Sequence, residues 1–382
     1  MIDDEFILLL IFDYLNRNDI FNYLTTNKKL NSFLFKETFW QLILNNRIRE
    51  TKENPNLNYK RLFRKNSYKD AYIIFDILLI AQNRIDKLKN KNVCQLYNLP
   101  KLKIINSKLD NLSPSIGYLI NLQNLNLNYN KIHELPKTMQ NYYRLQVLNL
   151  EGNQINDISV IRFLHNLRVL KASHNQIRNL PNIDQLKKLE ILDLSCNNLI
   201  KIGKLPPTLK KIHFYNNDIK DIDPTIFNNL KKLKELSLAY NKLEELPDIF
   251  NSMINLEDLF LSYNQLTTLP KSLKNLTKLR GLMLDHNKFE IIQEEIFGLK
   301  NLTQLRLAYN KISYVPETLV NLKFLTQLDL GKNNLKEIPF SITNLEYITH
   351  VYLGMNNFSE EDKNMIKNWK FKPNSRPIYI LF

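Results

Sequence analysis

The sequence predicts an α/β solenoid of about twelve stacked units. A short motif, Leu-x-x-Leu-x-Leu-x-x-Asn, recurs along most of the 382-residue chain, with clear copies at 256–264, 279–287 and 302–310. The spacing between copies stays close to 23 residues. Asparagine ends almost every copy, and Ser107 takes its place in the first. A fixed period of this length is typical of repeat proteins, in which each unit packs against its neighbours.

The composition limits the classes of protein to which the chain can belong. The apolar fraction of 44% is enough for a continuous core, and the formal net charge is +15. The first five residues are acidic where a secretion signal needs positive charge, and no apolar run reaches the roughly 20 residues of a membrane span. Two cysteines, Cys94 and Cys196, do not suggest a disulfide framework. We expect a cytoplasmic protein without a membrane partner, or one in the host cytoplasm if its source is a virus or intracellular parasite.

The first ninety-odd residues lack the repeat. Apolar spacing predicts one helix near Phe6, a second that begins at Asp19 and a third that holds Trp40, followed by helix over 58–88. We therefore expect a helical domain over 1–46 and linker helices over 47–92. The alternative is that the helical domain and the linker helices only form a cap that seals the first coil of the repeats.

The order of residues in 6–43 resembles an F-box, the helical module that docks onto Skp-type adaptors of SCF ubiquitin ligases. The matching pieces are Leu-Ile-Phe-Asp-Tyr-Leu at 10–15, Asn-Asp-Ile at 18–20, Asn-Lys-Lys-Leu at 27–30 and Thr-Phe-Trp at 38–40, while the family's opening Leu-Pro is absent. The resemblance implies a Skp-like partner. The residues that it implies for this contact are Ile7, Phe12, Leu15, Ile20, Leu24 and Trp40.

Within each repeat the Leu-x-Leu segment alternates with period two, which indicates a short strand with its leucines buried. The asparagine has donors and an acceptor that can satisfy backbone groups of the following turn. Residues 97–358 resemble a leucine-rich-repeat domain, and Leu-Pro pairs such as Leu135-Pro136 are similar to its intracellular 23-residue class. The resemblance implies a horseshoe with strands on the concave side, and we place the repeats at 93–358.

Two parts of the array are expected to depart from the regular unit. The step from Asn197 to Asn217 is 20 residues long, which is too short for a helix on the return segment. Residues 359–382 are expected to cap the array, with a helix that begins after Ser359 and has Met365, Ile366 and Trp369 on its apolar face. The tail beyond it either docks on the last coil or folds back over the array, and the sequence leaves both open.

The sequence gives little sign of catalytic chemistry. The histidines lack metal-ligand spacing, and no phosphate-binding or dinucleotide-binding glycine motif is present. His174 and Cys196 precede successive repeat asparagines and are expected to be neighbours, but a nucleophile also needs an orienting group and an oxyanion site in a pocket. We therefore expect no enzyme, no catalytic or metal-binding residue and no cofactor.

The outward strand positions identify a candidate binding face. Aromatic residues, Met and Arg gather in repeats seven to ten and are ringed by acidic residues, which is the usual anatomy of a protein-binding surface. The alternative is that each tyrosine before an asparagine only packs along the array. The predicted target-binding residues are Glu235, Tyr240, Asp258, Phe260, Tyr263, Met283, Asp285, His286, Arg306 and Tyr309.

These observations predict a protein-interaction adaptor, the substrate-recognition subunit of an SCF-type ubiquitin ligase, with an unknown target protein. The alternative is a repeat scaffold without a ubiquitin role, whose N-terminal helices act only as a cap. The strand face mixes both signs of charge, so it is not expected to bind nucleic acid, which needs a continuous basic track. Lysines on the outer flanks, including Lys187-Lys188 and Lys231-Lys232, leave RNA association as a third alternative.

Overall fold

The structure is a computed structural model, and it describes residues 93–112, 114–369 and 379–381. The described residues fall into two compact units, one from 93–101, 114–122 and 136–142 and the other from 102–112, 123–135 and the chain from 143 on. The predicted F-box-like domain at 1–46 and the linker helices at 47–92 lie outside the described residues. The expected Skp-adaptor contacts, Ile7, Phe12, Leu15, Ile20, Leu24 and Trp40, lie outside them too.

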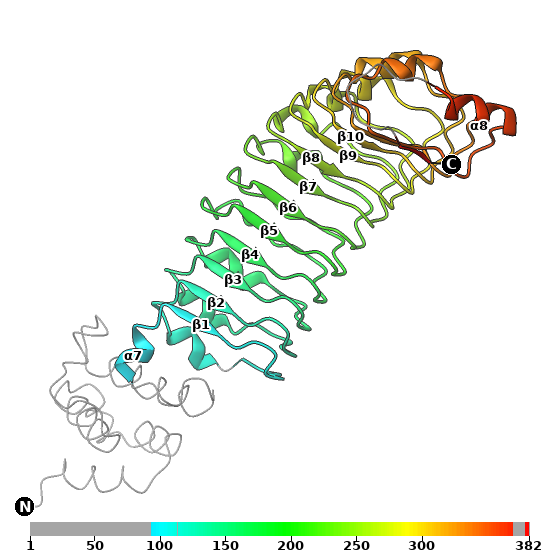
Figure 1. Cartoon of the computed structure of the whole chain (residues 1–382). Helices are drawn as coiled ribbons and strands as arrows, with labels where there is room; N and C mark the ends of the chain where they lie inside the picture. Colours follow the sequence, from blue (N-terminus) through cyan, green and yellow to red (C-terminus); the bar gives the residue numbers. More distant parts are fainter. Residues whose placement is uncertain (1–92, 113, 370–378, 382) are drawn as a thin grey trace, which may run out of the picture. The chain divides into compact units, whose positions relative to one another are not determined.

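The described residues form one sheet of thirteen parallel strands that follow one another in chain order (Figure 1). Its strands are β1 (Lys101–Lys103), β2 (Asn124–Asn126), β3 (Val147–Asn149), β4 (Val169–Lys171), β5 (Ile191–Asp193), β6 (Lys211–His213), β7 (Glu235–Ser237), β8 (Asp258–Phe260), β9 (Gly281–Met283), β10 (Gln304–Arg306), β11 (Gln327–Asp329), β12 (His350–Tyr352) and β13 (Tyr379–Leu381). The predicted parallel arrangement of the repeat strands is confirmed.

The core follows from the period of two along each strand. The middle residue of each repeat strand points inward, as Leu259, Leu282 and Leu305 do, and these side chains are fully buried. They stand opposite one another in a constant register from strand to strand. Burial of a leucine side chain contributes about 1.5–3 kcal/mol, so the stacked leucines are the main source of stability.

The repeat asparagines form a second buried column, as predicted. Asn287 donates from Nδ2 to the carbonyl oxygens of Leu261 and Leu284, each at 3.0 Å. Its Oδ1 accepts the backbone N–H of Leu266 at 3.0 Å. Each asparagine thus satisfies backbone groups of its own turn and of the preceding unit, where an unpaired buried group costs about 1–3 kcal/mol.

Most return segments carry a short 3-10 helix. These are η3 (Pro114–Tyr118), η4 (Lys137–Asn141), η5 (Ser159–Phe163), η6 (Pro224–Phe227), η7 (Phe250–Ser252), η8 (Lys271–Asn275), η9 (Glu294–Gly298), η10 (Glu317–Asn321) and η11 (Phe340–Asn344). Residues 194–210, all of them described, contain no helix, which confirms the prediction for the 20-residue step. Residues 172–190 contain none either, which was not predicted. There the returns pair as extended backbone, with a parallel bridge between Asn179 and Lys201.

The unit built from 93–101, 114–122 and 136–142 contains α7 (Val93–Tyr97) with η3 and η4. Tyr142 is fully buried and donates its hydroxyl to the Ile116 carbonyl oxygen at 2.6 Å. Asn121 donates to the Tyr97 carbonyl oxygen at 2.8 Å. These bonds join segments from successive repeats within this unit.

The C-terminal part carries α8 (Glu360–Lys367) and β13. The predicted helix start is confirmed, because Ser359 and Asp362 form a reciprocal capping box. Ile366 is buried as expected, but Met365 is 53% exposed, so its predicted place in the apolar face is wrong. An eight-residue helix that turns one stripe inward leaves the adjacent position facing solvent.

The tail makes a strand, which answers the question that the sequence left open. β13 pairs in parallel with β12, and the backbone N–H of Leu353 donates to the Leu381 carbonyl oxygen at 2.7 Å. Trp369 makes an edge-on ring contact with Phe340, with ring centroids 5.5 Å apart. Within the described residues, no helix combines the length and apolar character needed to cross a membrane.

Candidate functional site

The strand face brings together the residues predicted for its centre. The constant register places Phe260 opposite Met283 and Met283 opposite Arg306. Phe260 and Met283 are half-buried and Arg306 is exposed. The prediction that these three side chains lie side by side on an exposed sheet is confirmed. They form a row of two apolar side chains followed by one cation.

Beside this row runs a stack of rings that we call the aromatic ladder, made of Tyr215, Tyr240, Tyr263, His286 and Tyr309. The rings of Tyr240 and Tyr263 stack with centroids 3.8 Å apart. His286 lies between Tyr263 and Tyr309, at 3.9 and 3.8 Å from their ring centroids. Tyr215 meets Tyr240 edge-on at 5.0 Å. The ladder therefore crosses five successive repeats without a gap.

The backbone explains why these rings stack. Tyr240, Tyr263, His286 and Tyr309 each directly precede a repeat asparagine, and each has φ between 54° and 56°. This left-handed conformation is uncommon outside glycine. The same turn recurs in every repeat at the strand spacing of about 4.8 Å, so each ring leaves the backbone in the same direction as its neighbour. Face-to-face contact at the observed distances follows, and aromatic pairs contribute about 0.5–1.5 kcal/mol.

The stacking decides which atoms a partner can reach. Each inner ring is covered on both faces, and the ammonium group of Lys332 lies 4.2 Å from the centroid of the last ring, Tyr309. Ring edges and hydroxyl groups therefore form the exposed surface of the ladder. A hydrogen bond with Tyr240 raises the pKa of Tyr263, and burial adds to the effect. Burial lowers the pKa of His286, and Lys332 and Arg306 act in the same direction, while Asp285 partly opposes them.

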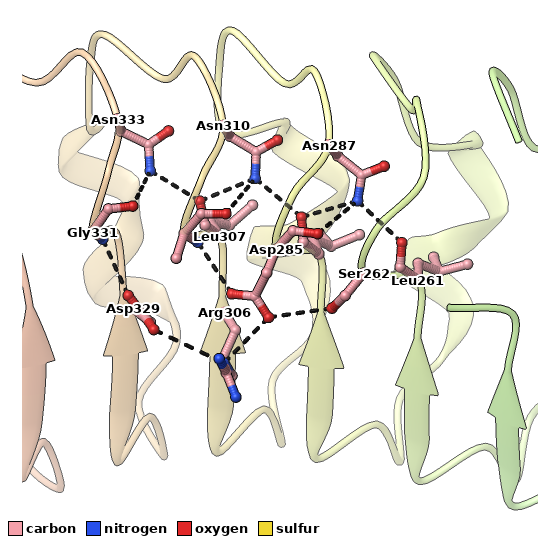
Figure 2. Close-up of polar contacts among 12 residues, drawn as sticks. Leu261, Ser262, Asp285, Asn287, Arg306, Leu307, Asn310, Asp329, Gly331 and Asn333 are labelled. Atoms are coloured by element: carbon pink, nitrogen blue, oxygen red, sulfur yellow. Dashed lines mark hydrogen bonds and ion pairs between the residues drawn. The ribbon is translucent and has the colours of Figure 1, made fainter. Parts of the chain in front are cut away.

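Asp285 does not lie where the sequence predicts it. The prediction placed it on the exposed surface, but the residue is only 5% exposed. Its carboxylate accepts the Ser262 hydroxyl and the Ala308 N–H, both at 3.2 Å, as Figure 2 shows. Its Oδ2 also lies 3.2 Å from Nε of Arg306. Asp285 is thus unavailable to a partner and instead fixes the position of the Arg306 guanidinium.

The remaining acidic residues form a partial rim. Burial alone would raise the pKa of Glu235, but hydrogen bonds from Lys211 and His213 outweigh it and leave the pKa lowered. Burial raises the pKa of Asp258, and the nearby Glu235 carboxylate adds to the effect. Of these two carboxylates, Asp258 is the one whose pKa is raised.

Sequence reasoning missed two members of this site. Lys332 occupies the same position before its asparagine as the ladder residues, so the asparagine column already placed it in line. His213 lies on β6 and its Nε2 is 2.8 Å from Glu235. The only earlier signal for His213 was its outward strand position.

The pair considered for nucleophilic chemistry is not assembled as one. His174 and Cys196 are neighbours on adjacent repeats, as expected, because the Asn175 N–H donates to the Cys196 carbonyl oxygen at 3.2 Å. The Cys196 thiol accepts the Asn216 amide at 3.6 Å, and no hydrogen bond between it and His174 is found among the described residues. Within the same part of the chain, no group of three or more His, Cys, Asp or Glu side chains gathers as metal ligands would.

Two family models match the chain. The leucine rich repeat model matches 120–177, 247–289 and 278–335, and the model of leucine rich repeats in two copies matches 165–206 and 207–251. Together they span 120–335, more than half of the chain. The chain is a leucine-rich-repeat protein.

Solved structures with leucine-rich repeats resemble it too. An internalin, inlF, from Listeria monocytogenes is 24% identical over 75% of this chain and 92% of its own, with a TM-score of 0.56. The functional domain of InlJ from the same organism is 22% identical over 70% of this chain and 56% of its own, with a TM-score of 0.59. At these sequence identities, the two similarities support the fold and nothing beyond it.

The ectodomain of the plant receptor kinase GASSHO1/SCHENGEN3 from Arabidopsis thaliana is 27% identical over 65% of this leucine-rich-repeat chain and 34% of its own, with a TM-score of 0.54. That structure is a complex with Casparian strip integrity factor 2. A search of the curated proteins found no match to the chain.

Proposed function

We propose that this leucine-rich-repeat protein is an interaction adaptor that binds a target protein on the strand face between β7 and β11. The observation that carries the proposal is the unbroken aromatic ladder beside the row of Phe260, Met283 and Arg306. Aromatic, Met and Arg side chains are enriched in the cores of protein interfaces, where a few of them dominate the binding energy. The plant receptor ectodomain supports a macromolecular ligand by analogy, because it was solved with its own bound factor.

The chemistry of the face narrows the expected partner. Ring edges and hydroxyls of the ladder favour hydrogen-bond acceptors such as backbone carbonyls and carboxylates. Arg306 is oriented by Asp285 and exposed, so it also favours a carboxylate. Asp258 favours a lysine or arginine on the partner, which would remove part of the energetic cost of its burial. We therefore expect a target segment that carries both signs of charge and one apolar side chain over Phe260.

The test of this face begins with the full-length chain as bait in extracts of its native host. The captured target is then purified, and its complex with the chain is reconstituted. The double variant Phe260→Ala with Arg306→Ala is expected to weaken binding of the target at least about tenfold, because it truncates two central contacts. Phe163 and Arg162 form an exposed aromatic–cation pair on η5, away from the ladder. The double variant Arg162→Ala with Phe163→Ala is the matched control and should retain the target. Equal binding by both variants would place the partner elsewhere.

The finer proposal is that residues 1–46 dock the chain onto a Skp-like adaptor of a cytoplasmic SCF-type ubiquitin ligase. Its support is the resemblance of residues 6–43 to an F-box, which lies outside the described residues. In this role the chain would contribute proximity between ligase and target, and other subunits would transfer ubiquitin. The competing function is a repeat scaffold without a ubiquitin role.

Co-purification of the full chain with a Skp adaptor separates these two functions. Phe12→Ala with Leu15→Ala is expected to abolish the complex while the circular dichroism of the repeats stays unchanged. If no adaptor co-purifies, or if the double variant binds it as well as the parent chain does, the F-box assignment is wrong. Loss of the repeat fold on deletion of residues 1–90, without adaptor binding, would favour the scaffold with its helical cap.

A further inference from the structure

A hollow lies on the flank of the array beside the two helix-free returns. One depression of about 440 Å³ and another of about 520 Å³ lie next to each other, because both are lined by Lys187 and Lys232. We call the two together the basic hollow. Its charged lining residues are Arg168, Asp184, Lys187, Lys188, Glu190, Lys204, Lys210, Lys231 and Lys232. None of its lining residues belongs to the aromatic ladder or to the Phe260–Arg306 row.

The charge of the hollow is only partly neutralised. Glu190 forms ion pairs with Arg168 and Lys210, both at 2.7 Å. The ammonium groups of Lys187 and Lys232 make no hydrogen bond or ion pair within the described part of the chain, and both side chains are exposed. Seven cations face two carboxylates here. The hollow therefore keeps an excess of positive charge at the two residues that its halves share.

We propose that the basic hollow is a second interaction surface, and that it binds an acidic segment of a partner protein. Complementary charge favours such a segment and speeds its association. The hollow also offers aliphatic surface, since Leu205, Pro207 and Ile226 line its larger half. An acidic segment with an aliphatic side chain fits both features. This surface extends the proposed function, because a partner held here leaves the strand face free.

Nucleic acid fits the hollow less well. Single-stranded nucleic acid is usually held by aromatic side chains on which its bases stack, together with a continuous basic groove. No aromatic residue lines either depression. Asp184 and Glu190 interrupt the basic lining, and their carboxylates would repel a phosphate backbone. The lining thus favours a peptide, whose acidic side chains can be spaced to avoid these two positions.

Fluorescence anisotropy with the full-length chain tests the proposal. The probes are a short labelled peptide rich in glutamate that contains leucine, the same peptide with glutamine in place of glutamate, and single-stranded RNA of oligouridine. We expect the acidic peptide to bind, the glutamine peptide not to bind, and the affinity to fall as salt rises. Lys187→Glu with Lys232→Glu should weaken binding at least about tenfold.

The matched control is Lys300→Glu with Lys323→Glu, which makes the same change of net charge at exposed lysines outside the hollow. This control should bind the acidic peptide within about twofold of the parent chain. The strand-face variant Phe260→Ala with Arg306→Ala should bind it equally well, so failure of the target face and failure of the hollow are distinguishable. Absence of acidic-peptide binding, an equal loss in both lysine variants, or tighter binding of oligouridine would each overturn the proposal.

Discussion

The stretch from β7 to β11 and the stretch from β4 to β6 are built on the same core and differ in their return segments and in the surfaces that they present. Both keep the buried leucines and the asparagine column. From β7 to β11 the spacing is uniform and each return carries a 3-10 helix, whereas the two returns between β4 and β6 are shorter and have none. The first stretch presents stacked rings on its strand face, and the second presents a basic hollow on its flank.

The difference teaches that the core does not depend on the return segments. Asn217, at the end of the shortest repeat, donates to the Leu194 and Phe214 carbonyl oxygens at 3.0 and 3.1 Å. Its Oδ1 accepts the Leu199 N–H at 2.8 Å. These bonds match those of Asn287 in the regular stretch. The strand and its turn form a fixed module, and the outward and return positions are free to become binding surfaces.

The largest expected change in stability comes from loss of a repeat asparagine, and it tests whether the two stretches share this module. Asn287→Ala and Asn217→Ala should each lower the free energy of unfolding by about 2–4 kcal/mol, because each leaves several buried backbone groups unpaired. Urea denaturation followed by circular dichroism measures the loss. Asn301→Ala, which removes an exposed amide bonded to Thr277, is the control and should cost less than about 1 kcal/mol. A much smaller loss at Asn217 than at Asn287 would show that the short repeat is held differently.

A medium effect is expected where the short returns pack backbone against backbone. A Cβ added at Gly203 would lie 2.5 Å from the carbonyl carbon and oxygen of Pro181. Gly203→Ala should therefore cost about 1–3 kcal/mol. At Gly298, in a regular return, the nearest atom is the Lys274 Cβ at 3.1 Å, so Gly298→Ala should lie within about 1 kcal/mol of the parent chain. Equal effects in thermal unfolding would contradict the closer backbone approach at Gly203 than at Gly298.

The smallest expected effect concerns the ladder and depends on pH. The folded chain lowers the pKa of His286, chiefly by burial, so the unfolded chain binds the proton more tightly. Stability from this group is complete above the ordinary histidine pKa of about 6.5 and is lost as pH falls below it. His286→Tyr keeps a ring in the stack and removes this loss. Between pH 7.5 and 5, its melting temperature should fall about 1–2 °C less than that of the parent chain.

His174 provides the matched control in the short stretch. It occupies the same position before its asparagine with φ 54°, but it is exposed and has no ring partner among the described residues. His174→Tyr makes the same exchange outside the stack, and its effect on the melting temperature is subtracted from that of His286→Tyr. If both substitutions act alike, the stack around His286 is not the cause.

The sequence predicts the row of Phe260, Met283 and Arg306 because two simple rules determine it. A period of two orients alternate side chains outward, and a constant repeat length sets the register between strands. Neither rule determines how deeply an outward side chain is covered. Asp285 lies two residues before its asparagine, where the equivalent Tyr215 is 38% exposed. The Asp285 carboxylate is buried because Ser262, the Ala308 N–H and Arg306 of neighbouring repeats bond to it.

The sequence predicts the ladder as a column, and the alternative that its tyrosines pack along the array matches the observed stack. The asparagine spacing places Tyr240, Tyr263, His286 and Tyr309 in line. Their left-handed φ values direct the rings onto one another. The turn imposes these values, and the residue types Tyr and His do not by themselves indicate a left-handed conformation.

Length alone does not explain the helix-free return at 172–190. The repeat from Asn153 to Asn175 is equally long, at 22 residues, and carries η5. The helix-free segment passes as extended backbone, in which the Leu180 N–H donates to the Lys201 carbonyl oxygen. Repeat length therefore predicts only one of the two helix-free returns.

The uniform register of the regular stretch has a consequence for how such a chain can change length. Excision of the 23 residues from 241 to 263 would join Tyr240 to Asn264 and keep every remaining ring directly before an asparagine. Tyr240 would then stand against His286, and the ladder would be one rung shorter but still continuous. Insertion of one more such unit would lengthen it in the same way. Gain or loss of whole units is thus a route by which this surface can be resized for partners of different length.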